Sequence, residues 1–309
     1  MNNTLTYKEP TKGLVIAAFA AVYTIWGSTY VGIAMAIRSV PPFLMAGLRF
    51  FAAGFILFIY CLAKGEKMPP VTSVAKNSFG GILMLGAGTT SLIWAEQYLP
   101  SGRAAVIVAS IPFFFVILDK RNWKQNFNDK FIISGILIGF AGIILLFQGK
   151  GSINLHNRQQ LLGFIVLAVG SVLWAAGSLY SKYSVSQGST LFKASIQMMA
   201  AGIAGFICSV IANERQSFEW GSVTNSSIYA MLYLIFIGSL IGYIAYIWLL
   251  SVRPPSMVGT YAYVNPAVAI FLGWLIAHET ITIQQVLALV VILAGVLMVN
   301  LSKYINRQS

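Results

Sequence analysis

Two ionisable side chains stand inside stretches of the sequence that are otherwise apolar. Arg49 follows Pro41 and Pro42 within one such stretch, and Glu96 closes another. A charge in an apolar environment is costly, so it usually faces the protein interior, a partner charge or water. Arg49 could therefore contact an anionic group of a small molecule, pair with Glu96, or extend its guanidinium to a polar interface. Glu96 could carry a coupling proton, pair with Arg49, or be an interfacial acid at a helix end.

Two prolines each lie near the middle of an apolar stretch and predict bent helices. Pro112 and Pro266 are 154 residues apart, and a proline removes one backbone N–H and displaces the carbonyl four residues earlier. Asn265, next to Pro266, adds a polar donor and acceptor at the same depth. We expect the two bent helices to flank a central site that Asn265 faces. The alternative is that both prolines make structural kinks only.

Aromatic residues with small polar neighbours form the third group of candidates. Trp26 is followed by Tyr30, Trp174 is followed by Ser178, and the two tryptophans are 148 residues apart. Wide rings beside small side chains can build a cavity wall, whereas tryptophan at a membrane interface is the ordinary alternative. The residues expected to line a pathway for a small molecule are Trp26, Tyr30, Arg49, Trp94, Trp174, Ser178, Tyr261 and Asn265.

Catalytic and metal-binding patterns are missing from the sequence. The two histidines, His156 and His278, both fall in segments between apolar stretches. No spacing typical of paired metal ligands, of a nucleophile with its base, or of a phosphate-binding loop occurs. We therefore expect no metal site, no cofactor and no enzyme activity.

The elements that must position these residues are membrane-spanning helices. The chain has 309 residues, of which 58% are hydrophobic and 9% are charged, whereas soluble domains carry about 25% charged residues. Such a chain cannot cover a surface that faces water, which excludes a soluble enzyme, a nucleic-acid-binding module and a disordered chain. The apolar stretches are long and continuous, unlike the alternating pattern of an outer-membrane barrel.

Ten stretches are long enough to cross a bilayer, since a helix needs about 20 apolar residues to span the hydrocarbon. They are residues 13–37, 43–63, 79–97, 102–118, 131–148, 161–181, 192–212, 228–250, 256–277 and 283–302. We therefore predict an all-α polytopic membrane protein with ten transmembrane helices.

The net charge of +12 indicates the orientation of these helices. If the N-terminus is inside, fourteen Lys and Arg residues fall in inner segments and five in outer segments, and Arg49 lies within a span. Cytoplasmic segments carry the excess of Lys and Arg in membrane proteins. The count therefore predicts that both termini are cytoplasmic, with the chain in the plasma (inner) membrane.

The two halves of the chain repeat each other. The offset is 148 residues for the tryptophan pair and for Ala52-Ala53-Gly54 on Ala200-Ala201-Gly202, and about 154 for Gly88 on Gly242 and for the proline pair. The predicted units are residues 13–148 and 161–302, with five helices each. Because five is odd, the second unit must enter the membrane from the opposite face, and inverted repeats of this kind are typical of secondary transporters.

These residues resemble the EamA-domain branch of the drug/metabolite transporter superfamily. The segments that carry the resemblance are "YTIWGSTYVGIAMAIRSVPPFLMAGLRFFAAG", "AEQYLPSGRAAVIVASIPFFFV" and "GTYAYVNPAVAIFLGWLIAHETIT". The resemblance implies ten helices in two EamA repeats, cytoplasmic termini and a central cavity built largely from helices 1, 3, 4, 6, 8 and 9. It also implies transport of small metabolites, often export of amino acids. The chain departs from repeat symmetry at Glu279, because the first repeat has no equivalent Glu.

The predicted function is secondary transport of a small organic metabolite by alternating access around the central cavity, with amino acids or related compounds as exported substrates. The expected partners are a small-molecule substrate, the lipid bilayer and a coupling proton or other ion, but no nucleic acid. A non-transporting membrane sensor or scaffold is the alternative, and a membrane-embedded enzyme a weaker one. Neither the sequence nor the resemblance names the substrate or the oligomeric state.

Overall fold

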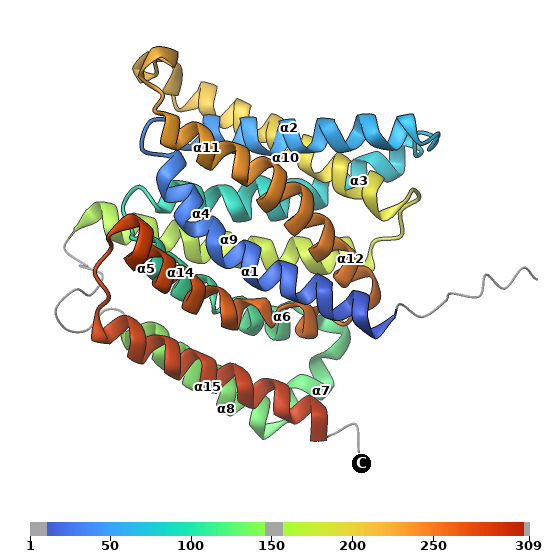
Figure 1. Cartoon of the computed structure of the whole chain (residues 1–309). Coiled ribbons are helices and arrows are strands. Elements are labelled where there is room, and N and C mark those ends of the chain that lie inside the picture. The colour runs from blue at the N-terminus through green and yellow to red at the C-terminus, as the bar shows by residue number, and fades with distance from the viewer. Residues whose placement is uncertain (1–10, 146–156, 306–309) are drawn as a thin grey trace, which may run out of the picture.

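The computed structural model of the chain describes residues 11–145 and 157–305, and these residues form helices and short loops without a strand. The long helices run side by side in one bundle (Figure 1). The predicted fifth span, residues 131–148, ends three residues beyond the first described segment, and His156 also lies outside the described residues.

The first half of the chain supplies five spans. The helices are α1 (Lys12–Ala36), α2 (Pro42–Ala63), α3 (Val71–Gly81), α4 (Thr90–Ala95), α5 (Ser101–Val108), α6 (Ile111–Leu118), α7 (Trp123–Asn128) and α8 (Lys130–Leu145). A π-helical stretch, Ile82–Thr89, joins α3 to α4, so that these three pieces make one continuous third span. The fourth span consists of α5 and α6.

The second half has the same plan. Its helices are α9 (Arg158–Tyr183), α10 (Thr190–Ile211), α11 (Asn225–Tyr233), α12 (Ile244–Val252), α13 (Pro255–Val258), α14 (Tyr261–Ala277) and α15 (Ile283–Ile305). Here the π-helical stretch is Leu234–Tyr243, and it joins α11 to α12 in the eighth span. Both π-helical stretches therefore occur in the third helix of their repeat.

Ten helical segments of the described residues are apolar enough to match the ten predicted spans. Seven are long enough to cross a membrane by length and composition, and three shorter apolar ones are Lys130–Gly142, Val264–Ala277 and Ile283–Gly295. The predicted start of the third span at residue 79 is wrong, because the helix begins at Val71. Its first turns are polar, and the amide of Asn77 donates to the Ser73 carbonyl at 2.8 Å, so hydropathy alone does not reveal them.

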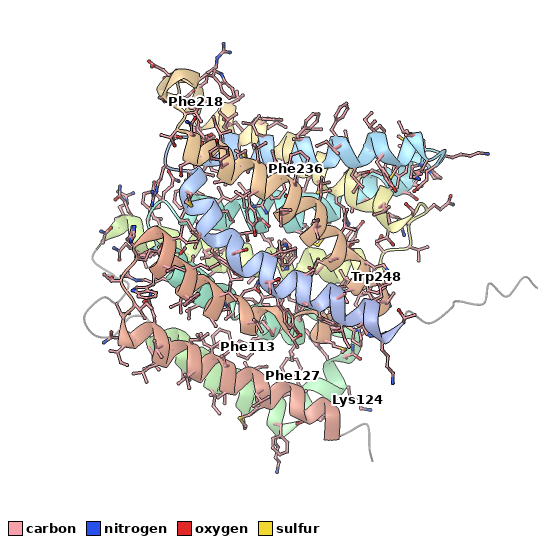
Figure 2. The ribbon with its side chains drawn as sticks, viewed as in Figure 1. Phe113, Lys124, Phe127, Phe218, Phe236 and Trp248 are labelled. Carbon is pink, nitrogen blue, oxygen red and sulfur yellow. The ribbon has the colours of Figure 1, made fainter. Side chains whose placement is uncertain are left out.

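The start of α1 and the end of α15 lie at the same end of the bundle (Figure 1). We call this the terminal end, and the opposite end, with the loops 37–41, 96–100, 212–224 and 278–282, the distal end. Lys124 lies at the terminal end and Phe218 at the distal end (Figure 2). An even number of spans accounts for α1 beginning and α15 ending at the same end of the bundle.

The contact between α2 and α10 shows the symmetry of the two halves. A Cβ added to Gly54 would lie 2.6 Å from the backbone nitrogen of Met199, and one added to Gly202 would lie 2.4 Å from that of Phe51. The two contacts are equivalent in the repeat, because Gly54 corresponds to Gly202 and Phe51 to Met199 at an offset of 148 residues. Residue numbers rise along α2 as they fall along α10, so the related helices are antiparallel. Each glycine is required because the two backbones touch there.

A second pair of related helices, α8 and α15, packs in the same way. A Cβ on Gly142 would lie 2.7 Å from a side-chain carbon of Ile292 and 2.9 Å from its nitrogen, and one on Gly295 would lie 2.6 Å from the nitrogen of Gly139. These contacts exchange at an offset of 153 residues. Phe113 reaches from α6 toward α8, where Gly139 leaves room for its ring (Figure 2). The fold is thus two inverted five-helix units related by a pseudo-twofold axis.

The two prolines act differently on their helices. The fourth span breaks at residues 109–110, just before Pro112, and the N–H groups of Ser110 and Phe113 donate to carbonyls three residues earlier. The ninth span instead breaks at residues 259–260, and α14 continues through Pro266. A bend near each proline therefore occurs, but in the second repeat the break precedes the proline by more than one turn.

Candidate functional site

A cavity lies in the middle of the bundle, between helices of both repeats. The volume inside it that water can occupy is about 70 Å³, which is smaller than typical small-molecule sites of about 300–1,000 Å³. Its wall comes from α1, α2, both π-helical stretches, α4, α5, α6, α9 and α14. This set contains helices 1, 3, 4, 6, 8 and 9 of the resemblance, with helix 2 in addition.

Six of the eight expected pathway residues line this cavity. They are Trp26, Tyr30, Arg49, Trp174, Tyr261 and Asn265. Ser178 is fully buried behind the wall, where its hydroxyl donates to the Trp174 carbonyl at 2.8 Å and lies 2.7 Å from the Tyr246 hydroxyl. Trp94 lies instead in a separate open groove at the distal end, together with Arg38 and Gln97.

Four aromatic rings meet at the terminal side of the cavity. The ring centroid of Trp26 lies 5.5 Å from that of Trp174, 4.9 Å from that of Tyr246 and 5.1 Å from that of Tyr261. The Trp26 indole N–H donates to the Gly238 carbonyl at 3.2 Å. Rings at these separations and tilts attract one another, so the repeat-related tryptophans form one rigid apolar wall rather than an interfacial belt.

Arg49 enters the cavity from α2 and is 4% exposed. Its Nε donates to the Ser239 hydroxyl at 2.9 Å, and its guanidinium carbon lies 5.0 Å from the centroid of the Phe50 ring. The Nη1 group is buried and has no hydrogen-bond partner among the described residues. The guanidinium is thus inside the protein, with one donor edge left over.

Glu96 is also buried, with 8% of its surface exposed, at the end of α4. Neither of its carboxylate oxygens has a hydrogen-bond partner within residues 11–145 and 157–305. Glu96 does not line the central cavity, although it interacts electrostatically with Arg49 and with Glu279. The two charges expected as a possible pair are therefore neighbours without a direct hydrogen bond.

Asn265 links α14 to α1 beside the cavity. With its amide nitrogen turned toward them, it donates to the backbone carbonyls of Tyr23 and Tyr261, each at 3.0 Å. Asn265 is 1% exposed, and such a buried amide must be hydrogen-bonded to be tolerated. The Tyr23 hydroxyl also contacts the Thr260 hydroxyl at 2.6 Å, next to the break in the ninth span.

Sequence reasoning missed the polar residues of the π-helical stretches. Thr89 and Ser239 line the cavity from the two repeats, and so do Gly88, Gly238 and Tyr243. A π-helical turn widens the helix and often occurs at functional sites. The signal available in the sequence was the small-residue spacing from Gly238 to Gly242 together with the match of Gly88 to Gly242. Such spacing is also typical of close helix packing, so it does not by itself indicate a cavity wall.

Two carboxylates tie the repeats together at the distal end. Glu214, after α10, accepts hydrogen bonds from the backbone N–H groups of Phe43 and Leu44 at 3.0 and 2.8 Å. Glu279, after α14, accepts from those of Ser101 and Gly102 at 2.9 and 3.2 Å. Each acid of the second repeat therefore caps the start of a helix in the first, where the helix dipole favours negative charge. Glu279 is therefore a helix cap, and Glu214 has the same role at the other contact.

Comparison with known proteins agrees with this architecture. The model of the EamA-like transporter family matches residues 11–148 and 161–301, one match for each repeat. The chain therefore belongs to the EamA-like transporter family and is a multi-pass membrane protein of transporter type.

Individual relatives extend over nearly the whole chain. One is the "Uncharacterized inner membrane transporter YedA" of Escherichia coli (strain K12), 38% identical over 94% of this chain and 92% of the relative. A "Probable amino-acid metabolite efflux pump" of the same organism is 24% identical over 89% of this chain and 90% of the relative. A solved crystal structure with 17% identity superimposes with a TM-score of 0.67 over 94% of this chain and 98% of that one, and it shows the shared fold.

Proposed function

We propose that this protein is a secondary transporter that exports a small organic metabolite, an amino acid or a related compound, by alternating access. The observation that carries the proposal is the central cavity walled by repeat-related elements of two inverted units. Exchange of conformations between two such units opens the cavity first to one side and then to the other. The efflux-pump name of one relative supports the direction and the substrate class.

The orientation in the membrane follows from charge. The terminal end holds most of the Lys and Arg residues, including Lys64, Lys76, Lys120 and Lys182, whereas Arg38, Arg103 and Arg215 are at the distal end. By the positive-inside rule we place the terminal end in the cytoplasm. Lys182 also donates to the carbonyls of Leu250 (2.7 Å), Ser251 and Arg253, which fixes the ends of α9 and α12 on that side.

The cavity walls would select the substrate, and the expected pathway residues keep this role in the proposal. Trp26, Trp174 and Tyr261 form the apolar wall, and Asn265, Tyr30 and Arg49 supply polar groups. Glu96 is the candidate coupling group, because a buried carboxyl without a hydrogen bond can take up and release a proton as its surroundings change. Trp94, in the distal groove, would contact the substrate on its approach path. Ser178, behind the cavity wall, would keep that wall rigid.

The test compares excreted metabolites between cells with and without the protein, followed by uptake of the candidates into everted membrane vesicles. We expect at least one compound to accumulate in vesicles that contain the protein, and a proton gradient to alter its rate if protons are coupled. Vesicles from cells that lack the protein serve as the control. If no compound of a broad metabolite panel moves faster than in vesicles that lack the protein, the proposal is wrong.

A further inference from the structure

The central cavity contains a charged hydrogen-bond donor that nothing in the described part of the chain satisfies, and an uncharged donor also lines it. The charged donor is Nη1 of Arg49, which is 4% exposed. The uncharged donor is Nε1 of Trp174, which is 6% exposed and interacts with the hydroxyls of Tyr246 and Tyr261. Both residues line the cavity, and both groups can donate but not accept. A buried donor left unpaired costs the full desolvation energy of that group. The unpaired Nη1 group of Arg49 therefore calls for a ligand with hydrogen-bond acceptors.

The unpaired Nη1 group of Arg49 has no counterpart at the equivalent position of the second repeat. The equivalent residue at an offset of 148 is Gln197, which is 1% exposed and fully engaged. Its amide nitrogen donates to the Ser181 hydroxyl at 2.9 Å, and its oxygen accepts from the Tyr243 hydroxyl at 2.9 Å. The first repeat thus replaces a satisfied neutral amide with a charged group held by Ser239 and Phe50 so that Nη1 stays free.

The positive charge of Arg49 is the second reason to expect an anionic ligand. Among the described residues that line the cavity, Arg49 is the one charged side chain. Glu96 is outside the lining, and no carboxylate oxygen lies within hydrogen-bond distance of Nη1. An unpaired charge in a membrane interior is expensive, so an anionic ligand offsets that cost. The lining offers no acid to receive an ammonium group.

The rest of the cavity wall is mostly apolar, which indicates a ligand with a hydrophobic body. Trp26, Trp174 and Tyr261 present ring faces or edges, and Leu85 and Leu92 add aliphatic surface. Such a surface binds a compact hydrophobic group and has few polar positions that need to be matched. A planar carboxylate suits a guanidinium edge better than a spherical anion, because two oxygens can accept from one fork.

We propose that the cavity binds a small organic carboxylate, with its carboxylate at Arg49 and its hydrophobic body against the aromatic wall. The inference rests on the proposed transport function and names the substrate class of that site. The carboxylate group, rather than an amino group, is the feature that the site recognises. An acid without an ammonium group therefore binds at least as tightly as the amino acid with the same body.

The experiment uses the full-length protein purified in detergent and measures dissociation constants by tryptophan fluorescence. The probes are benzoate, phenylpropionate, indoleacetate and naphthoate, each compared with its neutral amide and, for phenylpropionate, with phenylalanine and phenethylamine. We expect the acids to bind about 10- to 100-fold more tightly than their amides, the range of a hydrogen bond to a charged group. If no acid of the series binds more tightly than its amide, or if phenylalanine or phenethylamine binds more tightly than phenylpropionate, the proposal is overturned.

Three variants assign the effect to Arg49. Arg49→Gln introduces the residue that the second repeat carries at this position and should bring the acid-to-amide ratio close to one. Arg49→Lys keeps a charge without the fork and should retain part of the preference, which provides a readout if Arg49→Gln does not fold. Arg158→Gln, an exposed arginine at the start of α9, should leave the ratio unchanged. An unchanged ratio in a folded Arg49→Gln protein would contradict the proposal.

Transport measurements separate this inference from the proposed function. Uptake of neutral or cationic compounds into vesicles, with no preference for acids, would leave the transporter in place and remove the carboxylate site. Acid-selective binding to Arg49 without transport of any compound would leave the site and remove the transporter.

Discussion

The contact between α2 and α10 allows the repeat symmetry to be tested by two substitutions that should have equal effects. Gly202→Val places a Cβ 2.4 Å from the backbone nitrogen of Phe51, and Gly54→Val places one 2.6 Å from that of Met199. Both positions are about 1 Å inside ordinary van der Waals contact. Because backbone atoms block the new side chain, no rotamer change relieves the clash, and the helices must separate.

The expected loss of stability follows from two opposing effects. Overpacking of a close contact costs about 1–3 kcal/mol, and the two further methyl groups of valine place the result toward the upper end. Replacing glycine in a helix returns only about 0.3–0.5 kcal/mol, because valine is itself a modest helix former. We therefore expect each variant to lose roughly 1–3 kcal/mol, and the two losses to agree within about 1 kcal/mol since the contacts are related by the repeat.

The assay is thermal unfolding of the purified protein in detergent, monitored by fluorescence-detected size exclusion. Each variant should lower the midpoint by several degrees. Gly13→Val is the control, because a Cβ there meets nothing within 4 Å, and it should unfold like the parent protein. A normal midpoint for both interface variants would refute the backbone contact. A large effect of one variant and none of the other would refute the equivalence of the two repeats.

Three further predictions concern the cavity and the distal caps. Glu279→Ala and Glu214→Ala each leave two helix-terminal N–H groups without their carboxylate. Each substitution should lower the free energy of unfolding by about 1–2 kcal/mol. Stability equal to that of the parent protein would show that the caps do not stabilise the fold. Asn265→Leu removes both hydrogen bonds to the Tyr23 and Tyr261 carbonyls and should abolish vesicle uptake while the protein still inserts, and normal uptake would contradict its place in the pathway. Glu96→Gln keeps the shape of a carboxyl group but cannot exchange a proton, so uptake should lose its dependence on a proton gradient with folding unchanged; persistent dependence would exclude Glu96 as the coupling group.

The architecture could be predicted from the sequence because the apolar lipid environment determines it. Long apolar stretches in a chain with 9% charged residues leave only membrane-spanning helices. The matches of Trp26 with Trp174 and of Gly54 with Gly202 indicate the repeat. In the structure the two tryptophan rings are in contact, and the two glycines make equivalent contacts with Met199 and Phe51. Of the expected residues that line the cavity, Trp26 and Trp174 follow from the repeat, Arg49 from its charge in an apolar stretch, and Asn265 from its place beside Pro266.

Features that depend on individual hydrogen bonds could not be predicted from the sequence. The two π-helical stretches contain ordinary apolar and small residues, and a shift from four- to five-residue spacing leaves no clear pattern in composition. The early start of α3 at Val71 is hidden because polar residues such as Asn77 are satisfied by neighbours. The capping role of Glu214 is not visible in the sequence, because its partners at Phe43 and Leu44 are 170 residues or more away.

Access to the cavity from both sides of the membrane is the central claim, and cysteine labelling tests it most directly. Cys61 and Cys208 are replaced by alanine, and Thr29→Cys or Thr89→Cys then places a single thiol on the cavity wall. A membrane-impermeant thiol reagent is applied to sealed right-side-out and inside-out vesicles. We predict that the cavity thiol reacts from both sides, and a thiol that reacts from one side only, or from neither, would contradict alternating access.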